Sequence, residues 1–187
     1  MYSTIKLLIF SQLLILFLQT NRAYGTPTHS SVIGFDRIVA TINEQIITEQ
    51  DIANDVILLT HLPIESALLQ QYRQEQPLNF LLLQKQVKHL AGNIELYQPS
   101  EGAIQRRFLE FRSQWQSIAE YNQFLLTTGL NDQRIQGIIA THLLLENYQK
   151  INWGIALDSN NPNNQKYLAS WIQKNQLSFR IRIITAP

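Results

Sequence analysis

Two segments with β-strand character, one near each end of an otherwise helical chain, place the strongest constraint on the fold. Residues 35–42 are rich in β-branched side chains, and a polar reversal at residues 43–45 follows them. Residues 177–184 (LSFRIRII) alternate apolar and polar side chains, which indicates a half-buried strand. A strand with unpaired edges is unstable in isolation. We therefore expect residues 37–42 and 178–184 to pair with each other. The apolar positions of the alternation are Leu177, Phe179, Ile181 and Ile183.

Amphipathic helices are predicted between these two segments. Thr48 stands three residues before Asp51, which is the pattern of a capped helix start, and apolar residues at helical spacing follow. Pro77 suits the first turn of a further helix, because proline lacks an N–H that this position does not need. Gly92 suits the end of that helix, where the backbone often turns left-handed.

The second half of the helical region has its own start and stop signals. Residues 99–100 (Pro-Ser) open one helix, and Ser117 with Glu120 forms a capping box for the next, which closes near Gly129. A residue at 131–132 caps the last and longest helix. One face is expected to carry Ile104, Phe108, Phe111 and Trp115, and the inner stripe of the last helix Ile135, Ile138, Ile139, His142 and Leu143. The predicted fold class is mainly α, a compact helical domain with a small antiparallel β pairing between the N-terminal and C-terminal strands.

The first 25 residues are expected to be a cleaved secretory signal peptide. Lys6 precedes an apolar run from Leu7 to Leu18, and small residues stand at Ala23 and Gly25. The run is shorter than the roughly 20 apolar residues of a transmembrane helix. We expect cleavage after Gly25, and the alternative is an uncleaved anchor. Residues 26–34 would then be a flexible lead, and residues 35–187 one domain.

The charge and the cysteine content of the chain limit the cellular compartments and the classes of partner that we expect for it. Removal of residues 1–25 takes away two of the 15 basic residues, Lys6 and Arg22, and none of the 14 acidic ones. A nearly neutral chain has no electrostatic footprint for nucleic acid or for an anionic membrane surface. The chain has no cysteine, so its stability must come from packed apolar surface. We expect a periplasmic protein with no stable membrane anchor after cleavage.

No catalytic, cofactor or metal constellation is visible in the sequence. The four histidines are His29, His61, His89 and His142, and none has a second ligand at metal-binding spacing. His142, on an apolar stripe, is interpreted as a hydrogen-bonded core histidine. The acids Glu49, Asp51 and Asp55 are explained by the positive end of a helix. We therefore predict no catalytic residues, no metal and no cofactor.

The aromatic residues between positions 108 and 124 admit two interpretations. They are Phe108, Phe111, Trp115, Tyr121 and Phe124, and they fall on two successive helices. At helical spacing they are either a corner of the core or the wall of an apolar groove. A groove requires some of them to be exposed in one contiguous patch.

Residues 36–52 (DRIVATINEQIITEQDI) resemble the start of the mature SurA-type periplasmic chaperones, which have a related strand, turn and capped acidic helix. The resembling positions are Asp36, Arg37, Ile38, Val39, Ala40, Ile42, Asn43, Ile46, Ile47 and Asp51. Residues 78–93, 99–115, 124–150 and 171–184 resemble, in order, the following helices and the returning C-terminal helix and strand of that family. Each motif is degenerate, and their order carries the likeness across nearly all of residues 35–187.

This resemblance implies a trigger-factor-like peptide-binding module without its enzyme. SurA-type proteins usually carry parvulin-type prolyl isomerase domains at a place that residues 157–165 fill here, and so short a segment holds no domain. Residues 158–164 are expected to be a polar linker. Residues 97–99 also lengthen the usual short link after the helix cap at Gly92. Prolyl isomerase activity is therefore not transferred.

The implied function is ATP-independent binding of unfolded exported polypeptides, outer-membrane β-barrel precursors in particular. The candidate residues of a peptide groove are Phe111, Trp115, Tyr121, Phe124 and Tyr148. One alternative is a non-catalytic structural or assembly subunit that docks on one envelope partner, and another is a residual enzyme. The chain is expected to be a monomer, or a homodimer that exchanges its terminal helix about the hinge at residues 157–165.

Overall fold

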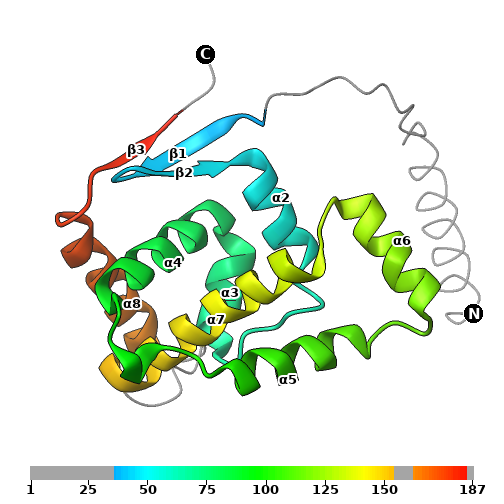
Figure 1. Cartoon of the computed structure of the whole chain (residues 1–187). Coiled ribbons are helices and arrows are strands. Elements are labelled where there is room, and N and C mark those ends of the chain that lie inside the picture. Colours follow the sequence, from blue (N-terminus) through cyan, green and yellow to red (C-terminus); the bar gives the residue numbers. More distant parts are fainter. Residues whose placement is uncertain (1–35, 154–161, 185–187) are drawn as a thin grey trace, which may run out of the picture. The chain divides into compact units, whose positions relative to one another are not determined.

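A three-stranded antiparallel sheet joins the first and last parts of the described residues, which are otherwise mainly helical (Figure 1). The computed structural model describes residues 36–153 and 162–184, and this part of the chain contains seven α-helices. The prediction of a mainly α fold with a small antiparallel β pairing is confirmed. The expected signal peptide, residues 1–25, and the expected lead, residues 26–34, lie outside the described residues.

The sheet pairs the strands that the sequence predicted to meet. Its order is β2-β1-β3, with strand β1 at Ile38–Ile42, β2 at Gln45–Thr48 and β3 at Ile181–Ile183. Asn43 turns the β1–β2 hairpin with a φ of 52°, a left-handed conformation that asparagine tolerates well. The same residue also reaches β3. Its N–H donates to the Arg180 carbonyl over 2.8 Å, and its side-chain oxygen accepts from the Arg180 N–H over 3.0 Å.

The predicted alternation of the last strand holds over a shorter stretch than expected. Phe179 is buried and packs beneath the sheet, but the Leu177 side chain is 92% exposed and that of Ile183 is 57% exposed. Helix α8 runs as far as Gln176, so Leu177 falls in the turn that follows it. β3 is also an edge strand, and of its two isoleucines only Ile181 packs against the apolar cluster beneath the sheet. The prediction of burial was therefore wrong for Leu177 and Ile183.

Helix α2, Glu49–Ile57, begins as predicted. The Thr48 hydroxyl accepts from the Asp51 N–H over 3.2 Å, and the Asp51 carboxylate accepts from the Thr48 N–H over 3.1 Å. This reciprocal pair satisfies two N–H groups that the first helical turn leaves free. The strand β2 consequently runs directly into the helix.

The main core lies between helices α3, α4, α7 and α8. The bounds are Ala67–Glu75 for α3, Pro77–Ala91 for α4, Asp132–Asn152 for α7 and Pro162–Gln176 for α8. Pro77 occupies the first turn of α4, and Gly92 ends it at a φ of 50°, as predicted. Asn131 caps α7 through its side chain. Helix α7 lies between α4 and α5 (Figure 1). The buried apolar residues of this core include Leu69, Phe80, Leu83, Val87, Leu145 and Leu168.

Helices α5 and α6 form a second packed region with the first half of α7. A short 3-10 helix, η1 at Glu95–Tyr97, leads to α5 at Glu101–Arg112, and α6 spans Ile118–Thr128. Ser100 and Ser117 cap the two α-helices as predicted. The predicted capping box at Ser117 is incomplete, because the Glu120 carboxylate accepts from the Gln116 N–H and not from Ser117. Trp115 was expected on α5 but follows its end.

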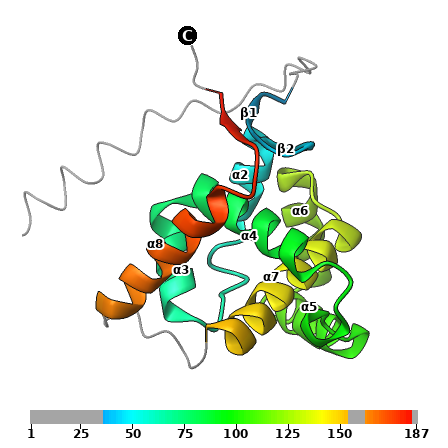
Figure 2. The ribbon, with the colours of Figure 1, turned by 90° about the vertical axis from the view of Figure 1, so that its left-hand side faces the viewer.

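Helix α8 and β3 return to the N-terminal half of the fold. Figure 2 shows α8 beside α3 and α4, with β3 leading from its end to β1. Leu168 is the buried anchor of α8 in the main core. Residues 162–164, expected to be part of a polar linker, are the first turn of this helix, where Pro162 is well suited. The rest of that linker lies outside the described residues.

A buried ion pair that the sequence did not reveal ties α2 to α3. The Arg73 side chain is fully buried, and its Nε donates to Asp55 Oδ2 over 3.0 Å. Its other nitrogens donate to the carbonyls of Leu62 and Asp55, over 2.8 Å and 2.9 Å. Asp55 lies in the second half of α2, so the helix-dipole explanation given for it was wrong. Its carboxylate is held by a specific cation across a loop.

His142 of α7 completes this buried group. It is buried as predicted, and its Nε2 lies 3.8 Å from Asp55 Oδ1, too far for a hydrogen bond. That nitrogen has no hydrogen-bond partner among the described residues, so the hydrogen bond expected of this core histidine is not made there. Burial lowers the pKa of His142 more than Asp55 raises it, and Arg73 lowers it further. Burial opposes ionisation of Asp55, but the contacts with His142 and Arg73 outweigh it, and its pKa lies below the ordinary value.

Candidate functional site

Four of the five predicted groove residues come together where α5, α6 and the end of α2 meet. The ring centroids of Trp115 and Phe124 lie 4.6 Å apart, and those of Phe111 and Tyr121 lie 6.2 Å apart. A fifth ring, that of His61, lies 5.0 Å from Trp115. We call these five residues the aromatic cluster. Phe111 belongs to α5, and Tyr121 and Phe124 belong to α6. Trp115 and His61 lie in the segments that follow α5 and α2, and α5, α6 and the start of α7 pack together around them.

Tyr148, the remaining predicted groove residue, lies in a different part of the molecule. It is near the C-terminal end of α7 and packs in the main core. Its ring centroid is 6.2 Å from that of Trp153 and 6.0 Å from that of Trp171 on α8. Burial raises the pKa of the Tyr148 phenol. The length of α7 explains the separation, because its first half packs on the aromatic cluster while its last turns pack on α8.

Two members of the aromatic cluster are core residues. Phe111 is 1% exposed and Tyr121 is 4% exposed. The Tyr121 hydroxyl donates to Asp132 Oδ1 over 2.5 Å, and the Arg112 guanidinium lies 5.0 Å from the centre of its ring. Burial raises the pKa of Tyr121, and the bond to Asp132 adds to this effect. Tyr121 therefore fastens α6 to the first turn of α7.

The other members line an open hollow. Trp115 and Phe124 are half-buried, and with His61 and Ile57 they form the apolar part of a depression of about 580 Å³. We call it the aromatic hollow. Its polar rim consists of Glu120, Gln123, Thr127 and Thr128. Glu120 and His61 are the ionisable side chains among the lining residues, so the hollow carries few charged groups.

His61 is a member of this surface that the sequence reasoning missed. It follows α2 in an irregular segment, and no periodic pattern places it beside the aromatic residues of α5 and α6. Its Nδ1 lies 3.1 Å from Gln114 Oε1, and Gln114 Nε2 donates to the His61 carbonyl over 2.9 Å. These two contacts, made by residues 53 positions apart, hold the loop against the end of α5.

Helices α5 and α6 also expose large aliphatic side chains. Leu109 is 54% exposed, Ile118 is 71% exposed and Leu126 is 79% exposed. None of the three lines the aromatic hollow. Helix α6, which carries most of the lining of the hollow, and its neighbour α5 therefore present apolar surface beyond the hollow.

The described residues form neither a metal-binding group nor a membrane-spanning helix. Among residues 36–153 and 162–184, no group of three or more histidine or acidic side chains is arranged to hold a metal ion. Of the helices formed by these residues, none has the length and apolar character needed to cross a bilayer. No family model matches the chain, and no curated protein or solved structure matches it significantly.

Proposed function

We propose that this chain is an ATP-independent, chaperone-like protein of the periplasm that binds unfolded exported polypeptides such as outer-membrane β-barrel precursors. The proposal follows from the sequence resemblance to SurA-type chaperones. The observation that carries it is the aromatic hollow, an open depression whose apolar wall is made by Ile57, His61, Trp115 and Phe124.

The physical properties of the hollow suit extended, unfolded chains of varied sequence. Aromatic faces gain contact energy from many kinds of side chain, because dispersion and area burial do not require one matching group. The threonine and glutamine side chains of the rim offer hydrogen bonds to a passing backbone. Because Glu120 and His61 are the only ionisable side chains among the described residues of the lining, charge does little to select between partners. Such a surface favours weak, tolerant binding over tight binding of one ligand.

The clients of this class share a matching chemistry. Strands of an outer-membrane barrel alternate apolar and polar residues and carry aromatic girdles. In water they pair edge to edge and aggregate unless their apolar side chains are covered. An open hollow that accepts one or two apolar side chains at a time would slow this pairing without any nucleotide.

A light-scattering assay tests the proposal. A chemically unfolded outer-membrane β-barrel protein is diluted into buffer without ATP, with or without the chain from Thr26 to Pro187. We expect suppression of scattering at near-stoichiometric ratios. No suppression would contradict the proposal and would favour the dedicated assembly subunit, with co-purification of one envelope partner as the next measurement.

Two variants locate the activity on the molecule. Phe124→Gln removes an apolar wall of the hollow, and we expect suppression to fall strongly because a half-buried ring is lost from the contact surface. Tyr167→Gln is the matched control, because Tyr167 is 45% exposed on α8 and away from the hollow. Circular dichroism must show both variants folded. If Phe124→Gln suppressed light scattering as strongly as Tyr167→Gln does, the hollow would be ruled out as the binding surface.

A further inference from the structure

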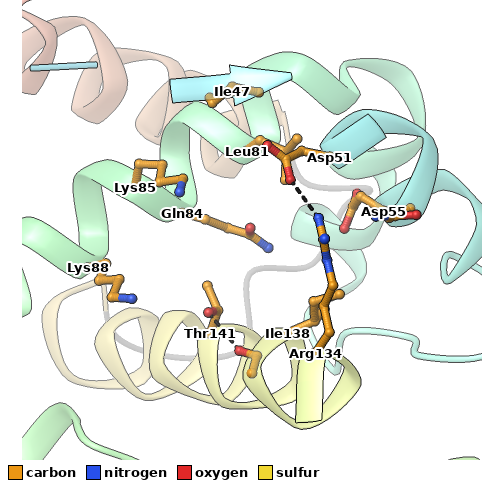
Figure 3. A pocket seen from close by; sticks show the side chains of 12 residues that line it. Ile47, Asp51, Asp55, Leu81, Gln84, Lys85, Lys88, Arg134, Ile138 and Thr141 are labelled. Carbon is orange, nitrogen blue, oxygen red and sulfur yellow. Dashed lines mark hydrogen bonds and ion pairs between the residues drawn. The ribbon is translucent and has the colours of Figure 1, made fainter. Parts of the chain in front are cut away.

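A second cavity, separate from the aromatic hollow, lies between helices α2, α4 and α7 (Figure 3). Its volume is about 320 Å³, at the small end of the range for ligand pockets. Helix α2 contributes two acids and α4 contributes two lysines. The lining residues are Ile47, Asp51, Asn54, Asp55, Leu81, Gln84, Lys85, Lys88, Arg134, Gly137, Ile138 and Thr141. We call it the cationic pocket.

The charges around this pocket do not balance. Arg134 on α7 pairs with Asp51 over 3.1 Å, and Asp55 is neutralised by Arg73 behind the pocket wall. Lys85 and Lys88 extend from α4 into the same space (Figure 3). In the described part of the chain neither ammonium group has an acidic partner. The two lysines therefore leave the pocket with an excess of positive charge.

Gln84 is a second, independent sign that a ligand belongs in the pocket. It is 7% exposed, and its side chain points into the space between α4 and α7 (Figure 3). Its Nε2 is buried and has no hydrogen-bond partner among the described residues. Buried amide donors are nearly always paired in folded proteins, because an unpaired one is destabilising. An acceptor bound in the pocket would supply the missing partner.

The rest of the wall is apolar. Ile47 and Leu81 are buried, and Ile138 is half-buried. Gly137 leaves open space, since a Cβ added there would meet no atom within 4 Å. The Thr141 hydroxyl donates to the Gly137 carbonyl over 3.0 Å, so its proton is already used. The pocket thus offers cationic and amide donors at one part of its wall and aliphatic surface at another.

We propose that the cationic pocket binds a small carboxylate with an apolar body. The carboxylate accepts from Lys85, Lys88 and the Gln84 amide, and the apolar body lies against Ile47, Leu81 and Ile138. A monoanion fits better than a dianion, because the carboxylates of Asp51 and Asp55, although paired, face the same space and repel further negative charge. The inference goes beyond the proposed function and does not depend on it.

Titration with hexanoate tests the assignment. Binding to the chain is followed at low ionic strength by calorimetry and by the amide NMR signals of Gly137 and Thr141. We expect saturable binding at millimolar hexanoate or below, with shifts at both amides. Hexanamide, which has the same body without the charge, should bind on the order of tenfold more weakly or not at all. Equal binding of hexanamide, or no binding of hexanoate, would overturn the proposal.

Inorganic phosphate and three variants complete the test. Tight phosphate binding without hexanoate binding would show a simple anion site and contradict the apolar half of the proposal. The double variant Lys85→Gln/Lys88→Gln should lose hexanoate binding, whereas Lys174→Gln, an exposed lysine on α8, should keep it. Gly137→Leu should block binding by filling the cavity. Retention by the double variant or by a folded Gly137→Leu would refute the site.

Hexanoate binding also distinguishes a failure of this inference from a failure of the proposed function. Phe124→Gln should bind hexanoate as the unmodified chain does, because Phe124 lines the other cavity. Loss of aggregation suppression with intact hexanoate binding would therefore contradict neither proposal. Loss of hexanoate binding in Phe124→Gln would show that the two surfaces are one and would overturn the present assignment.

Discussion

The cationic pocket and the aromatic hollow share one helix and differ in almost every physical property. Helix α2 contributes Asp51 from its first turn and Asp55 from its second half to the pocket, and its last residue, Ile57, lines the hollow. The pocket is the smaller of the two, about 320 Å³ against about 580 Å³, and its lining includes Lys85 and Lys88, whereas no lysine lines the hollow. Binding in the pocket would depend on the charges that face the ligand. Binding in the open hollow would depend on the apolar area that is covered.

The residues behind the pocket and those beneath the hollow also differ, in that the first are charged and the second are apolar. Behind the pocket lies the buried pair of Arg73 and Asp55, with His142 beside it. Beneath the hollow lie the rings of Phe111 and Tyr121. A buried ion pair depends on both of its partners, whereas an apolar layer depends on how well it fills its volume. The comparison therefore predicts different responses to mutation and to pH.

The largest expected effect comes from breaking the ion pair. Arg73→Met leaves the Asp55 carboxylate buried without its cation, and we expect the free energy of unfolding to fall by about 3–5 kcal/mol. Urea unfolding followed by circular dichroism measures the change. Arg37→Met is the control, because the pair of Arg37 with Glu49 is exposed, and its loss should cost about 0–1 kcal/mol.

A double variant sharpens this prediction. Asp55→Leu combined with Arg73→Met replaces both charges by apolar side chains, which is often neutral for a buried pair. We expect it to recover most of the stability lost in Arg73→Met. If Arg73→Met were as stable as the unmodified chain, the pair would not support the pocket wall as described.

Local signals in the sequence were sufficient to predict several helix ends and the first turn of this fold. Thr48 with Asp51, Pro77 with Gly92, and the polar turn at Asn43 are all read within a few residues, and the structure places each as predicted. The strand pairing was a non-local prediction, but it followed from a simple requirement, since two lone strands need partners.

The buried ion pair and the two candidate sites depend on contacts that no local sequence pattern encodes. Arg73 meets Asp55 across 18 positions, and His61 meets Gln114 across 53. The aromatic residues were predicted as a set, but spacing does not say which of them is buried. Phe111 and Tyr121 are core, Trp115 and Phe124 line a surface, and Tyr148 belongs elsewhere. The cationic pocket was missed because its charges come from three separate helices.

An intermediate effect is expected from pH, because the buried group behind the pocket titrates. The folded-state pKa of His142 is lowered, so the unfolded chain binds more protons below about pH 6.5. The free energy of unfolding should fall as pH decreases from that value, by at most about 1.4 kcal/mol per pH unit. Asp55 acts in the same direction at lower pH, since its stabilisation is lost as pH falls from about 3.9.

His142→Gln isolates this contribution. Urea unfolding at several pH values between 7.5 and 5.5 should show a smaller slope in the variant than in the unmodified chain. Glu146 changes the free energy of unfolding in the opposite direction. Burial raises its pKa, so its contribution to stability is lost as pH rises through the folded-state pKa. An unchanged slope in His142→Gln would mean that other groups carry the pH dependence and that the histidine is not held neutral by burial.

The smallest effects come from two glycines, one at each surface, and they should differ in sign. Gly137 lies inside α7 at the pocket, and a Cβ there meets nothing within 4 Å, so Gly137→Ala should raise the free energy of unfolding by about 0.5–1 kcal/mol. Gly129 ends α6 beside the hollow with a φ of 67°, where a side chain is strained, so Gly129→Ala should lower it by about 1 kcal/mol. Urea unfolding measures both. If both variants were destabilised, the backbone of α7 at the pocket would not be regular helix, and the shape assigned to the cationic pocket would have to change before that of the hollow.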